Sequence, residues 1–342
     1  MKKIRNIVKM ISFTTLVVLA SMVSGQIMRP LKTDVAVKNI DTFHALQEET
    51  VDVMILGSSH AWRGVDTMAM YEEYGIAAYN YANNWQHINT TSLFLKDAVL
   101  TQSPKVVVID TVSACNYLEN VDINGEVYYT TKISNKADKS TYLKQCFGDK
   151  VENYIKYYFP VTAFHDNWSN ITKESLTYNT CEKDFNASMG YMYTKKANPT
   201  TIKDYTKFTN MEFSEECIGS LDDIVQTCKD NNIELVFITL PWGTKNYKFL
   251  GAMEKYAQEN DCPYINMFEN YEEVGINPAT DYYDSQHLNY SGASKVGKFL
   301  GQYLKDNYEL EDIRNDKDNP WEQSLIKYNE DKKAANVPDG TE

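Results

Sequence analysis

The sequence predicts an α/β fold in which helices flank a five-stranded parallel sheet. Apolar runs of strand length recur along the chain, and amphipathic segments of helical length stand between them. The run 106–109 contains only Val and Ile, which is typical of a strand that is buried on both faces of a parallel sheet. Strands that alternate with helices imply right-handed crossovers, so we expect helices on both sides of the sheet.

The alternation begins at residue 51, where a short apolar run ends in Gly57-Ser58-Ser59-His60. This pattern predicts a buried strand that empties into a tight turn followed by a helix. Ser291 is the expected cap of the last helix. The predicted elements are, in order, a short helix at 42–47, a strand at 51–56, a helix at 67–74, a strand at 76–81, a helix at 90–100, a strand at 105–110, a helix at 214–231, a strand at 233–240, a helix at 246–259, a strand at 262–267 and a helix at 291–307.

The alternation stops between about residues 111 and 210. This stretch is rich in Tyr, Asn, Lys and Thr, and we interpret it as a partly helical insertion. The last residues are charged and polar, which predicts a surface extension. The expected organisation is an anchor or signal peptide at 1–28, a connector at 29–50, the α/β domain at 51–308 with the insertion, and a polar C-terminal extension at 309–342.

The N-terminus has the layout of an export signal. Lys2, Lys3, Arg5 and Lys9 precede an apolar segment at 11–23. Small residues at 20, 21, 24 and 25 favour cleavage, whereas the apolar character that continues to Met28 favours a membrane anchor. We expect an uncleaved anchor with an extracytoplasmic domain, and the alternative is a buried helix of a cytosolic protein.

The formal net charge is −13 and the pI is about 5.0, which argues against nucleic acid as a partner. Six widely spaced cysteines contain no CxxC pair, so a zinc site is not expected. In an exported protein the sequence allows one or two disulfides, with the cysteines at 115, 146 and 181 as the first candidates, and it does not determine their pairing. Cys217 and Cys228 fall on one apolar helix face and are expected to pack as small hydrophobes.

Ser59 and His287 are candidates for nucleophilic catalysis. A serine between a strand and a helix lies where open α/β sheets bind ligands, and free N–H groups there can stabilise an oxyanion. A serine needs a base, and an imidazole is suited to that task. Asp284 precedes His287 by three residues and can orient the ring from its far nitrogen. Taken alone, Asp284-Ser-Gln-His287 is more often an ordinary polar loop, and it favours a catalytic pair only together with the Gly57-Ser58-Ser59 turn of the same α/β fold.

Together these residues resemble the SGNH/GDSL hydrolase superfamily. Gly57-Ser58-Ser59 is similar to its nucleophile block, and Asp284-Ser-Gln-His287 is similar to its terminal Asp-x-x-His block. The resemblance covers about 45–120 and 215–305. It implies a flavodoxin-like three-layer sandwich, catalysis by Ser59, Asp284 and His287, and no metal or other cofactor. Ser58 and the basic N-terminus resemble an envelope branch that includes the D-alanyl-lipoteichoic acid transfer protein and partners of membrane-bound O-acyltransferases.

In that family the oxyanion hole is formed by the N–H of the nucleophile, a Gly N–H from a second sequence block and an Asn side chain from a third block. This chain does not match those donors residue for residue. Ala82 or Asn83 stands where the second block has Gly, and either can still supply a backbone N–H. The third block expects an Asn soon after the strand at 105–110, but Asn116 comes later. Asn84 supplies the side-chain donor, or the hole has two backbone donors only.

Several aromatic residues are candidates for lining a substrate site. His60 follows the nucleophile and is expected to line the pocket or cap the helix. Trp85 and Trp242 follow strand ends and are candidate walls for a sugar, with core packing as the alternative. His165 and Trp168 stand three apart in the insertion and are candidates for a glycan cleft, with a surface pair as the alternative.

The sequence therefore predicts an exported esterase or O-acyltransferase that acts on an acylated glycan or cell-wall polymer, with a membrane-bound O-acyltransferase as an expected partner. A non-catalytic accessory protein of the same fold is the alternative, since the second-block Gly and third-block Asn are missing. An exported lipase or peptidase fits less well, because no long apolar run indicates lipid uptake.

Overall fold

The structure is a computed structural model that describes residues 2–29, 35–115, 121–134, 136–177, 188–202, 212–243, 248–316 and 318–334. The chain forms two compact units. The smaller unit consists of Met1–Lys38, Asn120–Asn135 and Lys139–Lys183. The larger unit consists of Asn39–Glu119, Lys136–Asp138 and Asp184–Glu342, and it contains the sheet.

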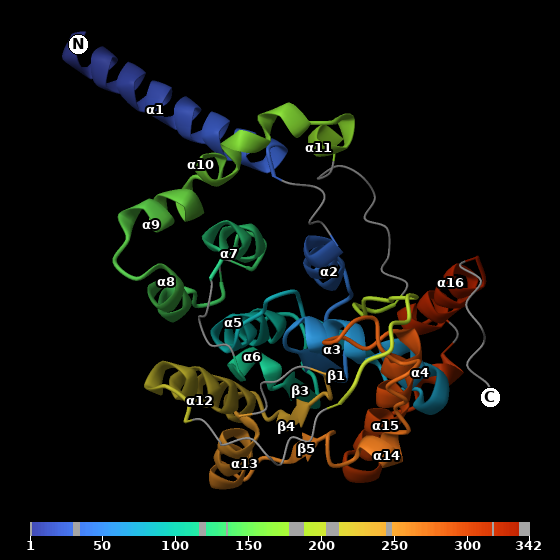
Figure 1. Ribbon diagram of the computed structural model, residues 1–342. Helices are drawn as coiled ribbons and strands as arrows, with labels where there is room; N and C mark the ends of the chain where they lie inside the picture. Colours follow the sequence, from blue (N-terminus) through green and yellow to red (C-terminus); the bar gives the residue numbers. More distant parts are fainter. Residues whose placement is uncertain are drawn as a thin grey trace. The chain divides into compact units, whose positions relative to one another are not determined.

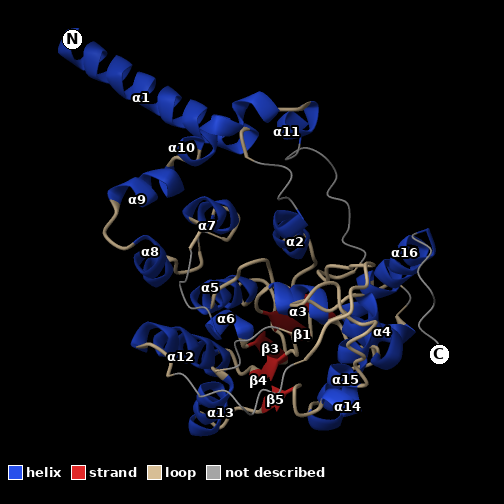
Figure 2. Cartoon of the chain, in the orientation of Figure 1, coloured by secondary structure: helices blue, strands red, loops and turns tan. Residues whose placement is uncertain are grey.

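The predicted α/β fold with a five-stranded parallel sheet is confirmed (Figure 2). The strand order is β2-β1-β3-β4-β5, and every neighbouring pair is parallel. After β1 the chain adds β2 on one side, and it then adds β3, β4 and β5 on the other side, so the direction of strand addition reverses between β1 and β3. Doubly wound sheets bind ligands in the crevice at this point of reversal. The strands are β1 (Val53–Leu56), β2 (Ala78–Asn80), β3 (Val106–Asp110), β4 (Glu234–Thr239) and β5 (Tyr264–Asn266).

Helices cover both faces of the sheet (Figure 1). On one face α5 (Ile88–Ala98) packs against α12 (Glu215–Asp230), and α13 (Leu250–Glu259) is tied to α12 by a hydrogen bond from Tyr256 to Asp222 of 2.8 Å. On the other face α4 (Thr67–Tyr74) packs against α15 (Tyr290–Asn307), and α14 (Tyr271–Val274) lies beside α15. The core is therefore the apolar sheet between two helical layers.

Side-chain caps fix where these helices begin. Ser214 caps α12 by accepting a hydrogen bond from the Cys217 N–H, and Asp66 caps α4 in the same way. The predicted cap Ser291 is wrong: Asn289 caps α15, because its side-chain oxygen accepts from the N–H groups of Ser291 and Gly292. Ser291 lies inside the first turn of α15. Asn289 directly precedes the helix, and there its side-chain oxygen can accept from these N–H groups.

Most predicted elements lie within a few residues of their observed bounds, but the short helix near 42–47 is misplaced. The structure has α2 at Val35–Phe43 and turns after it. Cys217 and Cys228 are buried on α12, as their spacing predicts. Cys146, Cys217, Cys228 and Cys262 are present as thiols, whereas the Cys115 side chain and Cys181 lie outside the described residues.

The C-terminal segment contains a helix, α16 (Pro320–Ala334), that packs against α4. Trp321 is buried, and its indole N–H donates a hydrogen bond of 2.8 Å to the carbonyl of Ala78 in β2. The Tyr328 hydroxyl donates a hydrogen bond of 3.0 Å to Asp66. Two buried aromatic residues thus fix an otherwise polar helix to the larger unit.

The smaller unit contains α1 (Lys2–Ile27), α7 (Ile123–Thr130), α8 (Ser140–Phe147), α9 (Val151–Tyr158), α10 (Val161–Phe164), η2 (His165–Asn170) and α11 (Lys173–Thr177). At 26 residues α1 is long and apolar enough to cross a membrane, a property that a signal sequence shares. Its last turn packs on α10, where a Cβ at Gly25 would lie 2.8 Å from the backbone nitrogen of Val161. The glycine thus permits close contact between the two helices.

Candidate active site

The turn after β1 is shaped by Gly57. Its φ is +143°, in the region that favours glycine, and a Cβ there would lie 2.6 Å from the Cβ of Asp110 at the end of β3. The turn therefore packs directly on β3, and α3 (Ser59–Gly64) begins within two residues. Ser59 is the first residue of that helix, at the carboxyl edge of the sheet.

The neighbouring Ser58 has a structural task. Its hydroxyl donates to a carboxylate oxygen of Asp110 at 3.1 Å, and it also accepts from the His60 N–H at 3.3 Å as the cap of α3. Burial raises the pKa of Asp110 to about 7, although hydrogen bonds from Ser58, Val112 and Leu240 oppose this rise. Ser58 thus holds the turn against β3 and caps α3.

A closed loop positions His287 opposite this turn. Tyr282 pairs with Leu288 in an isolated antiparallel bridge, and the Tyr283 N–H donates to the His287 carbonyl at 2.8 Å. At the base of the loop, Lys295 forms an ion pair of 2.7 Å with the buried Asp281. The loop is thus fixed to α15, which limits the positions that His287 can take.

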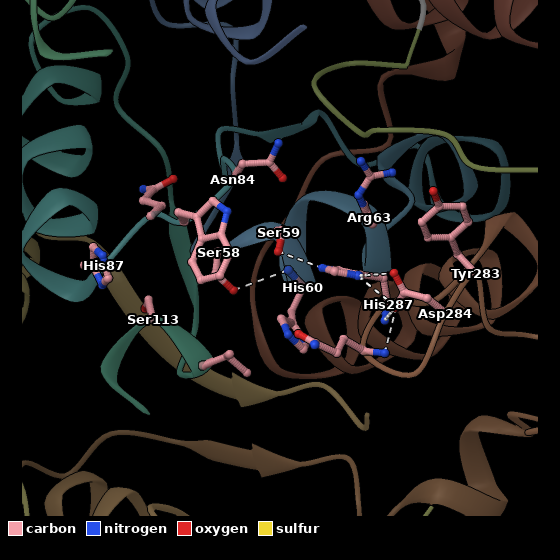
Figure 3. Close-up of a pocket in the computed structure, with 14 residues that line it drawn as sticks. Ser58, Ser59, His60, Arg63, Asn84, His87, Ser113, Tyr283, Asp284 and His287 are labelled. Atoms are coloured by element: carbon pink, nitrogen blue, oxygen red, sulfur yellow. Dashed lines mark hydrogen bonds and ion pairs between the residues drawn. The ribbon is translucent and has the colours of Figure 1, made fainter. Parts of the chain in front are cut away.

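Ser59, His287 and Asp284 form a chain of hydrogen bonds (Figure 3). The Ser59 Oγ lies 2.8 Å from the His287 Nε2, and the His287 Nδ1 lies 3.0 Å from both carboxylate oxygens of Asp284. A neutral imidazole that donates from Nδ1 to Asp284 leaves Nε2 to accept from the Ser59 hydroxyl. The three predicted residues are therefore brought together in the order that activates a serine.

The protonation states favour this arrangement. Burial lowers the pKa of His287 below its ordinary value of 6.5, with a smaller contribution from Arg63, although Asp284 acts in the opposite direction. Burial raises the pKa of Asp284, but hydrogen bonds from the Gln286 N–H and from His287 outweigh it, so that pKa is lowered overall. At neutral pH His287 is a neutral base beside an ionised carboxylate.

His60 lines the same pocket but is not suited to be the base. Its ring centroid lies 5.1 Å from that of His287, and the side chain is buried. Burial and the neighbouring His287 lower the pKa of His60 to about 3. The ring therefore stays neutral and forms part of the pocket wall, which is the first of the two positions that the sequence suggests for His60.

The expected backbone oxyanion donors are corrected by the structure. The Ala82 N–H donates to the side-chain oxygen of Asn80 at 3.2 Å, and the Asn83 N–H donates to the Gly57 carbonyl at 3.1 Å. Both groups are buried and used in holding the turns together. In contrast, no described residue accepts from the Ser59 N–H, and the Asn84 side chain lines the pocket. The candidate oxyanion donors are thus Ser59 and Asn84.

These side chains surround a cavity of about 220 Å³. Figure 3 shows Asn84, His87 and Ser113 on one side of the Ser59–His287 pair and Arg63, Tyr283 and Asp284 on the other. Sequence reasoning missed several residues that line the pocket. Each of them lies close in the sequence to a predicted site residue or to the end of a predicted strand, and that proximity could have identified them. Arg63 is one helical turn beyond Ser59, Gln86 and His87 follow Trp85, Val112 and Ser113 follow β3, and Tyr283 and Gln286 flank Asp284.

The predicted aromatic walls divide into three cases. Trp85 lines the pocket, and its side chain is 75% exposed. Trp242 is corrected to a core residue: it is buried, stacks on Phe249 with centroids 5.8 Å apart, and contacts the edge of His60. His165 and Trp168 belong to the smaller unit, where both are exposed. Trp242 is buried because its ring packs among the rings of Phe249, Phe268 and His60, and burial of so large an apolar surface is favourable.

No group of three or more His, Cys, Asp or Glu side chains within the described ranges could hold a metal ion. No protein-family model and no curated protein matches the chain. Solved structures similar to it include a candidate acylhydrolase from Bacteroides fragilis, at 12% identity and a TM-score of 0.38, with coverage of 78% of this chain and 93% of the other. A GDSL-like lipase from Bacteroides thetaiotaomicron is also similar, at 12% identity and a TM-score of 0.38, with coverage of 79% and 97%.

Proposed function

We propose that the protein is a serine esterase or O-acyltransferase of the SGNH type, which acts through an acyl group carried on Ser59. The observation that carries the proposal is the 2.8 Å contact between the Ser59 Oγ and the Nε2 of a histidine whose other nitrogen faces Asp284. A serine, a neutral base and an orienting carboxylate are what acyl transfer requires.

In the acylation step the Ser59 oxygen attacks the ester carbonyl while its proton passes to the His287 Nε2. The tetrahedral oxyanion accepts hydrogen bonds from the Ser59 N–H and the Asn84 side-chain amide. When the intermediate collapses, the ester C–O bond breaks and His287 gives its proton to the departing alcohol. Asp284 stabilises the imidazolium that exists between these two events.

In the deacylation step a second nucleophile occupies the place of the departed alcohol. His287 takes a proton from it and the new bond forms at the acyl carbon. The bond between that carbon and the Ser59 Oγ then breaks, and His287 returns the proton to Ser59. Water as the nucleophile gives hydrolysis, and a sugar hydroxyl gives transfer. The same residues serve both outcomes, so the access of an acceptor to the pocket decides between them.

The pocket favours a short acyl group. A cavity of about 220 Å³ lies below the usual range for drug-sized ligands, and its lining includes Ser, His, Asn, Gln and Arg side chains. A long alkyl chain would instead need a continuous apolar channel, because burying polar groups against it is unfavourable. Acetyl and other short esters of a sugar are therefore the substrates that we propose.

The proposed setting is the outer face of the plasma membrane, with α1 as an anchor and an acylated envelope polymer or exopolysaccharide as the substrate. The support is α1, which begins with cationic residues and has the length and apolar composition of a membrane span. A membrane-bound O-acyltransferase is the proposed partner, since it would supply acyl groups at the same surface.

Labelling by a fluorophosphonate probe tests this function. The full-length wild type and Ser113→Ala are expected to be labelled, because Ser113 lines the pocket but its hydroxyl donates to the Asp110 carbonyl at 2.8 Å. Ser59→Ala is expected to lose all labelling, since it lacks the activated oxygen. Labelling of Ser59→Ala at the wild-type level would refute the proposal.

A non-catalytic accessory protein is the second candidate, and a specific observation favours it. The Ala82 and Asn83 N–H groups are committed to other acceptors, so one backbone oxyanion donor is missing. If this candidate is right, the wild type binds acetylated glycan but does not release acetate from the glycan and does not react with the fluorophosphonate probe. Acetate release that depends on Ser59 would exclude it.

A further inference from the structure

Arg63 occupies a distinctive position in the pocket. It stands four residues after Ser59 in α3, and residues with this spacing lie on the same helix face. Both residues line the cavity, and Figure 3 shows the guanidinium group above the Ser59–His287 pair. A positive charge is thus held about one helical turn from the proposed nucleophile.

The guanidinium group is only partly satisfied by the protein. Its Nη1 donates to the Thr194 hydroxyl at 2.8 Å, and its centre lies over the rings of Trp62 and Tyr283 at 5.7 and 5.5 Å. Across the described ranges no carboxylate pairs with it, and its remaining N–H groups donate to no residue. An unpaired charge is unfavourable where it is shielded from water, so a half-buried guanidinium with open donors is a candidate to bind an anion.

The surroundings keep the guanidinium in place for a ligand. One nitrogen donates to the Thr194 hydroxyl and the central carbon lies over two aromatic rings, while Nε and Nη2 have no acceptor among the described residues. The edge formed by Nε and Nη2 presents two N–H groups in the geometry that matches two oxygens of a carboxylate or phosphate. A second cation, Lys196, lies 5.9 Å from the Tyr283 ring centroid.

The positive charge of Arg63 contrasts with the negative net charge of the chain. The chain has a formal net charge of −13, so its general field repels anions. A cation that lines the pocket of an acidic protein therefore indicates local recognition rather than general attraction.

We propose that Arg63 binds a negatively charged group of the substrate, a carboxylate or a phosphate, close to the ester that reacts with Ser59. This inference rests on the proposed function and specifies its substrate class: esters on an acidic glycan or a phosphate-containing polymer. Arg63 is then a binding residue that selects among esters that Ser59 can attack.

Paired esters test the selection with full-length protein. Phenyl acetate is the neutral reference, 4-acetoxybenzoate carries a carboxylate on the alcohol side, 4-acetoxyphenyl phosphate carries a phosphate there, and phenyl hydrogen succinate against phenyl butanoate places the charge on the acyl side. We expect wild type to have a higher kcat/KM for at least one charged ester than for its neutral counterpart. The charged ester preferred shows whether carboxylate or phosphate is the recognised group.

Arg63→Gln is expected to reduce that charged-to-neutral ratio at least about tenfold, the size of one charge-assisted hydrogen bond. Arg63→Lys should reduce it less, because the charge stays and only the paired geometry is lost. Thr194→Val removes the hydrogen bond that positions Arg63 but keeps the positive charge. It therefore separates the effect of positioning the Arg63 side chain from the effect of its charge. Lys105→Gln removes an equal charge that pairs with Asp52 near the amino end of β3, and it should leave the ratio unchanged.

Two results would overturn the inference while leaving the proposed function intact. One is a wild type that hydrolyses neutral and charged esters equally through Ser59, and the other is an Arg63→Gln ratio equal to that of wild type. If wild type hydrolyses none of the esters and is not labelled by the fluorophosphonate probe, the proposed function fails, and binding of benzoate and phenyl phosphate measured by calorimetry decides the anion site alone. There, equal affinities for wild type and Arg63→Gln would refute it.

Discussion

The hydroxyl of Ser59 lies 2.8 Å from the imidazole of His287, although 228 residues separate them in the chain. The turn after β1 supplies the serine, and the closed loop before α15 supplies the histidine. Each is held by its own contacts, Ser59 by the Gly57 turn on β3 and His287 by the Tyr282–Leu288 bridge. The alignment is therefore built into the fold before any ligand binds.

The kcat/KM for ester hydrolysis should fall in acid, and the midpoint of this fall should lie below pH 6.5. Burial lowers the pKa of His287 from its ordinary value of 6.5, and the neutral ring is the active form, so kcat/KM falls as pH drops through that lowered pKa. In Arg63→Gln the acid limb should move to higher pH, because a neighbouring cation that opposes protonation is gone. Initial rates between pH 4 and 8 measure both limbs.

His60→Gln is the matched control for that profile. The pKa of His60 lies at about 3, so this ring does not change charge in the range where the rate is measured. The acid limb should persist in this variant, and its disappearance would assign the base to His60 instead of His287.

Asp284→Asn should lower kcat by about 10²- to 10⁴-fold with a smaller change in KM. The carboxylate accepts the His287 Nδ1 proton and stabilises the imidazolium, and an amide cannot supply that charge. Steady-state kinetics with a short ester measure the split between kcat and KM. A kcat within twofold of wild type would show that Asp284 is only part of the loop.

Gln86→Met should make the protein more stable and the enzyme less effective. The Gln86 side chain lines the pocket and is buried, and in the described part of the chain neither its amide oxygen nor its nitrogen has a hydrogen-bond partner. Removing such an amide should raise the free energy of unfolding by about 1–2 kcal/mol, while kcat/KM falls if substrate satisfies the amide. Urea unfolding and ester kinetics measure the two effects.

Gln286→Met is its control, since Gln286 also lines the pocket but is exposed. Its unfolding free energy should match that of wild type. A loss of stability in Gln86→Met would show that this amide is satisfied within the free protein, for example by bound water.

Asp110 should make the protein less stable as pH rises towards neutrality. Its pKa is raised from 3.8 to about 7 in the folded state, so the native protein binds the proton more tightly than the unfolded chain. The resulting stabilisation is present at low pH and is lost as pH rises through about 7. Between pH 5 and 8 the change is at most about 3 kcal/mol.

Asp110→Asn should flatten this dependence in urea unfolding at several pH values, because an amide does not titrate. Some slope should remain, since burial also raises the pKa of Asp66, to about 6. An unchanged slope in Asp110→Asn would place the titrating group elsewhere.

Sequence reasoning was most successful where the physical signal is local. The Val and Ile run at 106–109 marks a buried strand, and the Gly57-Ser58-Ser59 turn after β1 is readable from neighbouring residues alone. Asp284 and His287 are also close in sequence, so one turn of chain suffices to place them. These signals predict the sheet, the serine and its proposed base.

Sequence reasoning failed where the outcome depends on competition in three dimensions. The N–H groups of Ala82 and Asn83 are present as expected, but the Asn80 side chain and the Gly57 carbonyl take them. Trp242 follows a strand as Trp85 does, yet only the folded core shows that Trp242 is enclosed. Such choices among partners are made by packing, and single residues do not encode them.

The most direct test of the central claim is the mass of the Ser59 peptide after reaction with p-nitrophenyl acetate and a rapid acid quench. An acyl-enzyme predicts that the peptide containing Ser59 gains the mass of one acetyl group, and that Ser59→Ala gains none. Acetate release with no acylated Ser59 peptide at any quench time, or with full activity in Ser59→Ala, would contradict acyl transfer through Ser59.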